Sequence, residues 1–283
     1  MTARNLITGA QNTWCPGCGN FVIQFALKNT IAALGKEGVD SDRIVLVSGI
    51  GCHAKMADYL NVNSFYSIHG RTLPVATAIK MANPELVVIV CAGDGDCYAE
   101  GLDHLVFAAK RNADITLLVH NNRVYGLTTG QYTPTSPLGF RGRSTPSGTV
   151  EEPFNPLAIM LASGATFVAR GCTRRMDLLQ RTVMEGVHHP GFAFIDVLQV
   201  CASYYNLSDY YEKRVYEISD HDEGDFEAAC RKAREWDYNA DAPIGLGTIY
   251  RAKRPTLEER LSATRGTETD RETIIRNVLE KRT

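Results

Sequence analysis

Short apolar runs of strand length alternate along this chain with segments whose apolar residues recur at helical spacing. Residues 86–91 are almost continuously apolar, which is typical of a strand in a parallel sheet covered on both faces. The same criteria predict strands over 43–47, 86–91, 115–119, 166–168 and 191–198, and helices over 19–35, 73–81, 99–111, 155–163 and 173–187. We therefore expect an α/β fold with an open, mostly parallel sheet and helices on both faces.

The alternation stops at two places. A stretch rich in Gly, Thr, Ser and Pro follows Asn121 and runs to about Thr149, and loops of that length in a compact domain are usually functional or disordered. After Cys201 the chain becomes rich in Tyr and charge, with one charged helix expected over 226–237. We interpret residues 1–201 as the main α/β domain and 202–283 as a short C-terminal extension that covers the site or contacts a partner subunit.

Composition narrows the function classes. Thirty basic and 32 acidic residues give a net charge of −2, which offers no reason to expect a partner such as nucleic acid or a membrane surface. No apolar run approaches the about 20 residues of a membrane helix, and no secretory signal is visible. We expect a cytoplasmic protein, in which cysteines serve metal binding or redox chemistry more often than disulfides.

The strongest local motif is Gly93-Asp94-Gly95-Asp96, at the end of the predicted strand 86–91. Ligands of open α/β sheets bind at the carboxyl ends of strands, where glycines let the backbone approach a phosphate. The next strand ends near Asn122, so its amide oxygen and the Asp94 carboxylate fall at one edge and suit Mg²⁺. Taken alone, the Gly-Asp-Gly motif would be interpreted as a tight turn whose Asp caps a helix. Because Asn122 follows the very next strand, we favour a metal site over that interpretation.

The eight cysteines divide into two sets. Cys91, Cys97, Cys172 and Cys230 lie in or beside apolar or helical stretches and are expected to be ordinary small hydrophobic residues. The other four lie among Gly, Pro and polar residues at segment ends: Cys15, Cys18, Cys52 and Cys201. Four thiolates are the usual ligands of a [4Fe–4S] cluster and also of a structural zinc ion. Spacing alone does not separate the two, although scattered cysteines are unlike a compact zinc knuckle.

Several motifs together resemble a known family. The Gly93-Asp94-Gly motif followed by Asn122 resembles the diphosphate motif of thiamine diphosphate enzymes. Over about residues 10–205 the chain resembles the β subunit of 2-oxoacid:ferredoxin oxidoreductases, through Trp14-Cys15-Pro16-Gly17-Cys18-Gly19, Gly49-Ile50-Gly51-Cys52-His53-Ala54-Lys55, His69-Gly70-Arg71, Val124-Tyr125-Gly126-Leu127-Thr128 and Gly130-Gln131. The resemblance implies the diphosphate-binding half of the thiamine diphosphate-binding fold. It also implies thiamine diphosphate, Mg²⁺ and one [4Fe–4S] cluster as cofactors.

The implied reaction is coenzyme A-dependent oxidative decarboxylation of a 2-oxoacid, with electrons passed to ferredoxin and the reverse direction fixing CO₂. Carried over by motif, the Mg²⁺ ligands are Asp94, Asn122 and the Val124 carbonyl, and the cluster ligands are Cys15, Cys18, Cys52 and Cys201. Further cofactor contacts are expected from Gly93, Gly95, Asp96, Tyr125, Gly126, Leu127 and Thr128. Asp96 is equally suited to capping a helix, and Val124 to packing.

Three cationic or titratable side chains are candidates for catalysis or for binding the substrate and cofactor. His69 lies in a Gly-flanked loop and is expected to face the thiazolium or the diphosphate, the alternative being a structural histidine. Lys55 is the candidate for the substrate carboxylate, the alternative being a surface lysine. Arg71 is a second candidate for phosphate or substrate charge. These cations slightly favour 2-oxoglutarate over pyruvate.

The chain carries no second α/β domain able to present a glutamate to the aminopyrimidine. We therefore expect an α subunit that supplies this domain, in an αβ or (αβ)₂ assembly, with ferredoxin as the electron acceptor. Two other functions stay open at this point: a non-oxidative thiamine diphosphate-dependent decarboxylase subunit with structural cysteines, and a zinc-stabilised non-catalytic interaction subunit.

Overall fold

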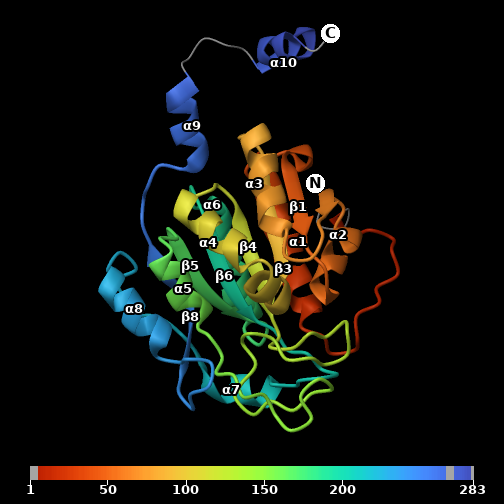
Figure 1. Ribbon diagram of the computed structural model, residues 1–283, viewed down its shortest axis with the longest axis vertical. Coiled ribbons are helices and arrows are strands. Elements are labelled where there is room, and N and C mark those ends of the chain that lie inside the picture. The colour runs from red at the N-terminus through yellow and green to blue at the C-terminus, as the bar shows by residue number, and fades with distance from the viewer. Residues whose placement is uncertain (1–5, 266–270, 282–283) are drawn as a thin grey trace.

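An eight-stranded sheet with helices on both faces forms the body of the protein in this computed structural model, which describes residues 6–265 and 271–281 (Figure 1). The strand order is β2-β1-β3-β4-β6-β5-β8-β7. All neighbouring strands are parallel except β5 and β8, which pair antiparallel. The fold class expected from the sequence is confirmed.

The central strands are buried on both sides because their residues alternate between two apolar cores. In β3 (Val87–Gly93), Val88 and Val90 belong to one core, and Ile89 and Cys91 to the other. The remaining strands are β1 (Ile44–Ser48), β2 (Asn63–Tyr66), β4 (Thr116–Asn121), β5 (Phe167–Cys172), β6 (Ala193–Leu198), β7 (Val215–Glu217) and β8 (Ile244–Arg251).

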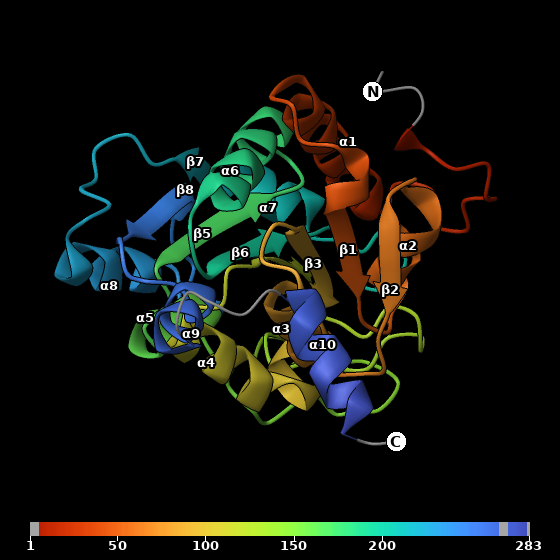
Figure 2. The ribbon, with the colours of Figure 1, turned by 90° about the horizontal axis from the view of Figure 1, so that it is seen from above.

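Helices cover both faces of the sheet (Figure 2). One core is closed by α1 (Asn20–Lys36), α2 (Met56–Tyr59) and α6 (Met176–His188), and the other by α3 (Thr72–Ala82), α4 (Leu102–Arg111), α5 (Pro156–Ala162), α7 (Ser208–Arg214) and α8 (Phe226–Arg234). Two further helices, α9 (Leu257–Arg265) and α10 (Arg271–Glu280), lie at the end of the molecule opposite the long loop after β4 (Figure 1). No described helix is long and apolar enough to cross a membrane.

The sequence reading placed no strand after residue 201, and here the structure differs. Strand β8 pairs with β5, and β7 pairs with β8, so both extend the sheet. Trp236, Tyr238 and Ile244 are fully buried in the core that α3, α4 and α5 cover. The part of the extension up to Arg251 is therefore built into the main fold. Strand β2, at the other edge, was also not foreseen.

Candidate active site

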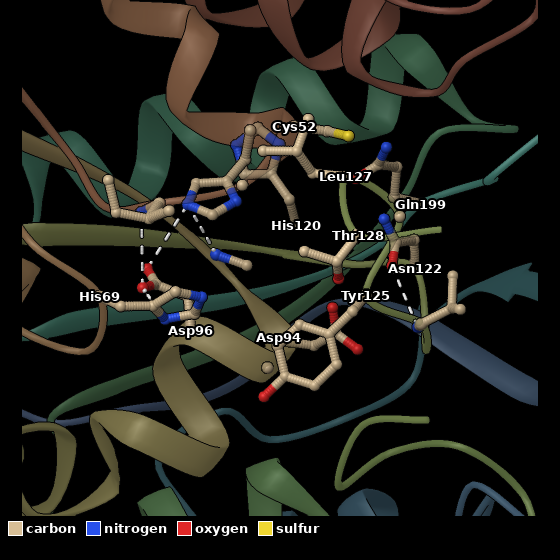
Figure 3. Close-up of a pocket in the computed structure, with 17 residues that line it drawn as sticks. Cys52, His69, Asp94, Asp96, His120, Asn122, Tyr125, Leu127, Thr128 and Gln199 are labelled. Atoms are coloured by element: carbon tan, nitrogen blue, oxygen red, sulfur yellow. Dashed lines mark hydrogen bonds and ion pairs between the residues drawn. The ribbon is translucent and has the colours of Figure 1, made fainter. Parts of the chain in front are cut away.

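A pocket opens where β1, β3, β4 and β6 end, and segments far apart in the sequence line it together. The wall contains the predicted cofactor residues Gly93, Asp94, Gly95, Asp96, Asn122, Val124, Tyr125, Gly126, Leu127 and Thr128, together with His69 and Cys52. Figure 3 shows Asp96 and His69 on one side of the pocket and Leu127 and Gln199 on the other. The structure thus brings the two predicted strand-end motifs to one cavity.

Asp94 is buried and held by hydroxyl groups. Its Oδ2 accepts a hydrogen bond from Thr133 Oγ1 at 2.6 Å, and Thr135 Oγ1 lies 3.3 Å away. Both threonines belong to the long loop that follows β4 (Thr116–Asn121). Burial raises the pKa of Asp94 to about 7, and the two hydroxyls only partly oppose this. The ion pairs of the described residues do not include Asp94, so its charge lacks a protein cation.

The loop after β4 begins with a tight turn that presents polar atoms to the pocket. Asn122 Oδ1 accepts a hydrogen bond from the Val124 N–H at 3.1 Å, and Arg123 adopts a left-handed conformation with φ of 61°. The buried Arg123 guanidinium donates to the carbonyl oxygens of Thr135 (2.7 Å) and Tyr238. The bond to Tyr238 anchors the turn to a segment that the sequence reading had assigned to the extension.

Asp96, two residues after Asp94, is instead surrounded by donors. Its carboxylate accepts from the Gly70 N–H at 2.8 Å and lies 2.9 Å from His69 Nδ1. Burial alone would raise the pKa of Asp96, but the imidazoles of His53 and His69 and the Gly70 N–H outweigh it and hold the pKa well below its usual range. The nearby Asp96 carboxylate in turn raises the pKa of His69. His69 is therefore more readily cationic than a free imidazole.

Two histidines that the sequence reading did not single out also line the pocket. His53 Nε2 accepts the Gly93 N–H at 3.1 Å and lies 3.4 Å from Asp96 Oδ2. His120 Nδ1 lies 2.8 Å from Asn20 Oδ1, which can only accept, so His120 donates there and its Nε2 is a buried acceptor without a partner. Burial lowers the pKa of His120 well below its ordinary value.

Tyr125 and the residues after it close the outer side of the pocket. The Tyr125 hydroxyl donates to Glu100 Oε1 at 2.9 Å, and its ring lies so close to Gly95 that a Cβ there would be 2.2 Å from ring carbon Cε1. Thr128 Oγ1 donates to Gln131 Oε1 at 2.6 Å. Leu127 is about half exposed at the pocket mouth. Gly95 thus has to be glycine for this wall to form.

The four cysteines of the predicted cluster set come together beside this pocket. Burial raises the pKa of Cys18, and it raises that of Cys52 to about 11. The other thiols of the set, Cys15 and Cys201 among them, are close enough to add to both shifts. All four are free thiols. Within the described ranges, no three His, Cys, Asp or Glu side chains close on one metal ion. The other four cysteines lie apart, with Cys91, Cys97 and Cys172 in the apolar cores.

Neither Lys55 nor Arg71 is part of the pocket wall. Lys55 Nζ donates to Thr13 Oγ1 at 2.8 Å, and its side chain is half-buried beside the loop that carries Cys15 and Cys18. The exposed Arg71 donates from Nη1 to the Glu100 carbonyl at 3.1 Å. Their roles toward the substrate stay predictions.

Comparison with known proteins matches this architecture along most of the chain. Residues 49–197 match the family model of the C-terminal thiamine pyrophosphate-binding domain of thiamine pyrophosphate enzymes, and residues 201–266 match the C-terminal part of pyruvate ferredoxin oxidoreductase beta subunits. The β subunit of 2-oxoacid:ferredoxin oxidoreductase 1 from Aeropyrum pernix is 40% identical over 269 residues, covering 90% of this chain and 83% of the relative. The chain belongs to the β-subunit family of 2-oxoacid:ferredoxin oxidoreductases.

Other members of this family agree. The β subunit from Saccharolobus solfataricus is 45% identical over 213 residues, which cover 74% of this chain and 69% of that one. A solved 2-oxoglutarate:ferredoxin oxidoreductase from Magnetococcus marinus, described with 2-oxoglutarate, coenzyme A and succinyl-CoA bound, superposes with a TM-score of 0.89 at 33% identity, covering 97% of this chain and 95% of that one. The predicted family, its oxidoreductase class and the thiamine diphosphate-binding fold are confirmed.

Proposed function

We propose that this β subunit holds thiamine diphosphate, Mg²⁺ and one [4Fe–4S] cluster for the coenzyme A-dependent oxidative decarboxylation of a 2-oxoacid, with ferredoxin as electron acceptor. The observation that carries the proposal is the position of Gly126. A Cβ at this residue would lie 3.6 Å from Cys52 Sγ, 3.7 Å from Cys201 Sγ and 3.8 Å from Asn122 Nδ2. The loop of the expected cofactor site therefore packs directly on two of the four expected cluster ligands.

The pocket residues fit a magnesium diphosphate. Asp94 is a buried carboxylate without a counter-charge, and a hard divalent cation is what such an oxygen ligand prefers. Asn122 and the Val124 carbonyl would complete the protein's share of the ligands. The Thr133 hydroxyl holds the Asp94 carboxylate in place through Oδ2. Gly93 and Gly95 keep the backbone clear for the phosphates.

Bound thiamine diphosphate supplies an electron sink for the carbanion left by decarboxylation. The chain's own residues position it and set the local charge. Asp96 holds His69 at the pocket mouth at 2.9 Å and favours its protonated form, which suits an anionic diphosphate or a substrate carboxylate. Tyr125, fixed by Glu100, and Leu127 form the outer side of the pocket.

We propose 2-oxoglutarate as the substrate, and reversal of the reaction as CO₂ fixation. The support is that a Mycobacterium tuberculosis relative named 2-oxoglutarate oxidoreductase subunit KorB is 42% identical over 188 residues (66% of this chain and 50% of that one), and that the solved Magnetococcus protein acts on 2-oxoglutarate. Lys55 and Arg71 remain the candidates for the substrate carboxylates. An α subunit would contribute the glutamate for the aminopyrimidine, in an αβ or (αβ)₂ complex.

Two alternative functions compete with this proposal, and measurements on one preparation of the complex distinguish all three. The anaerobically purified complex should be brown, contain four irons per β subunit, and reduce viologen with 2-oxoglutarate plus coenzyme A faster than with pyruvate. Aldehyde formation without viologen reduction would indicate a non-oxidative decarboxylase. Zinc without iron, and no retained thiamine diphosphate, would indicate a non-catalytic subunit.

Serine substitutions then assign the cluster ligands. Cys15, Cys18, Cys52 and Cys201 replaced one at a time should each lose the cluster absorbance and viologen reduction. Cys230→Ser, on helix α8, is the matched control and should keep both. An intact cluster in Cys201→Ser would remove that residue from the ligand set.

A further inference from the structure

Gln199 lies in the wall between the cofactor pocket and the four cysteines. It follows β6 (Ala193–Leu198) directly and lines the pocket (Figure 3). The residue is 1% exposed. Its backbone N–H donates to the Asn121 carbonyl at 2.9 Å, which fixes the residue to the end of β4. A long polar side chain buried on a fixed backbone has to satisfy its amide locally.

One half of that amide faces a cysteine. Gln199 Nε2 donates to Cys18 Sγ at 3.6 Å. A thiolate that ligates iron has no proton to give, so the amide has to present its N–H to this sulfur and its Oε1 elsewhere. Oε1 is indeed buried without a partner in the structure. The side chain is thus a polar bridge with one end on Cys18 and the other unsatisfied.

The chain is built to permit this contact. A Cβ at Gly19 would lie 2.6 Å from Gln199 Cγ and 2.9 Å from the Val200 nitrogen, so only glycine lets the start of α1 approach so closely. The Gly19 N–H donates to the Val200 carbonyl at 2.9 Å. The loop that carries Cys15 and Cys18 therefore packs tightly against the segment after β6, with Gln199 between them.

We propose that Gln199 is a positioning residue that raises the reduction potential of the iron–sulfur cluster through its N–H···S bond to Cys18 and turns its Oε1 toward a hydrogen-bond donor of the ligand in the pocket. This rests on the proposed function, since it needs a cluster on Cys18. Adding an electron makes the cluster and its thiolates more negative, and a buried N–H dipole aimed at sulfur stabilises that reduced state. The bond would therefore make it more favourable for the cluster to accept an electron from the ligand in the pocket.

The test is a redox titration of the cluster in the purified complex, followed by electron paramagnetic resonance. Gln199→Met keeps the side-chain length and removes the donor, and Gln199→Glu puts acceptor oxygens against the sulfur. Gln180→Met is the matched control, because Gln180 bonds Asn29 at 3.0 Å on α6, away from the pocket wall. We expect wild-type iron content in all three, a more negative midpoint potential in Gln199→Met, a still more negative one in Gln199→Glu, and no change in the control.

Each other result has a defined meaning. Full iron content with a wild-type potential in Gln199→Met overturns the proposal. Loss of the cluster from Gln199→Met while the control retains it also overturns it, because it assigns Gln199 to cluster assembly rather than to the potential. A wild-type complex without any iron–sulfur signal is a failure of the proposed function itself, and is visible before any variant is titrated.

Discussion

At the scale of single residues, two aspartates of one motif have opposite surroundings. Burial raises the pKa of Asp94 to about 7 although two threonine hydroxyls oppose the shift, whereas Asp96 is paired with His69 and the Gly70 N–H and has a pKa well below the usual range. Asp96 thus has its charge satisfied by the protein, and Asp94 does not. The printed motif gives no sign of this difference, because the partners come from loops 26 to 41 positions away.

Replacing Asp94 by asparagine should remove metal-dependent cofactor binding. The amide keeps the volume and the contact with Thr133 but loses the negative charge that Mg²⁺ needs. We expect at least about a 100-fold loss of thiamine diphosphate affinity, or about 2.7 kcal/mol, in equilibrium dialysis with Mg²⁺. Asp103→Asn, exposed on α4, is the control and should bind as wild type. Unchanged affinity in Asp94→Asn would refute the metal assignment.

His189 should make the protein less stable in acid. It is buried at the end of α6, with Nε2 2.8 Å from Thr166 Oγ1, and burial and the nearby Arg251 charge lower its pKa to about 4. Above the unfolded-state pKa of about 6.5 the ring is neutral in both states. As pH falls from about 6.5 to 4 only the unfolded state takes up the proton, so the free energy of unfolding falls by about 3 kcal/mol.

Urea unfolding of His189→Gln at pH 7 and pH 4.5 measures this contribution. The loss of stability between the two pH values should be smaller in the variant than in the wild type. His188→Gln is the control, since His188 is exposed and paired with Glu37, and it should keep most of the wild-type pH dependence. Equal pH dependence in His189→Gln and wild type would contradict the prediction.

At the scale of elements, the sequence predicted what local periodicity encodes. Strands such as 86–91 were placed within a few residues because both faces of the central strands are apolar. Helices such as 19–35 were placed as closely because their apolar residues recur at helical spacing. Strand β8 was missed because Gly245 and Gly247 interrupt its apolar run, and β2 because it is an exposed edge strand. The motifs at strand ends were found, but His53, His120 and Gln199 were not, because only the folded chain turns their side chains into the pocket.

Because β7 and β8 complete the sheet, a chain cut after residue 201 should not fold. The cut would expose the paired edge of β5 and remove Trp236, Tyr238 and Ile244 from the core. A chain cut after Arg265 is the control, since it loses only α10 and its flanking residues, and Ile275, Val278 and Leu279 of that helix are exposed. We expect the shorter chain in inclusion bodies and the longer one soluble with a full-length thermal midpoint. A soluble, cooperatively unfolding 1–201 fragment would show an independent domain.

At the scale of the whole molecule, cysteines from three distant segments and the two loops that line the pocket meet at one edge of the sheet. The mouth of the pocket at this edge is apolar and open: Ile50 and Leu127 in its wall are exposed, and Ile68, beside His69, is 72% exposed. Exposed apolar side chains around a polar cavity are typical of a surface that another chain covers. The described residues are built around one sheet, which is the diphosphate half of the thiamine diphosphate-binding fold.

The β chain alone should therefore be catalytically inactive even when its cofactors are present. Reconstituted with iron, sulfide, Mg²⁺ and thiamine diphosphate, it should hold the cluster but show no 2-oxoacid-dependent viologen reduction, because the glutamate that activates the aminopyrimidine would come from the α subunit. Adding that subunit should restore turnover and bury Ile68, which hydrogen-exchange protection of residues 63–70 would report. Full turnover by the β chain alone would mean that it contains a complete active site, and the open pocket mouth would then need another explanation.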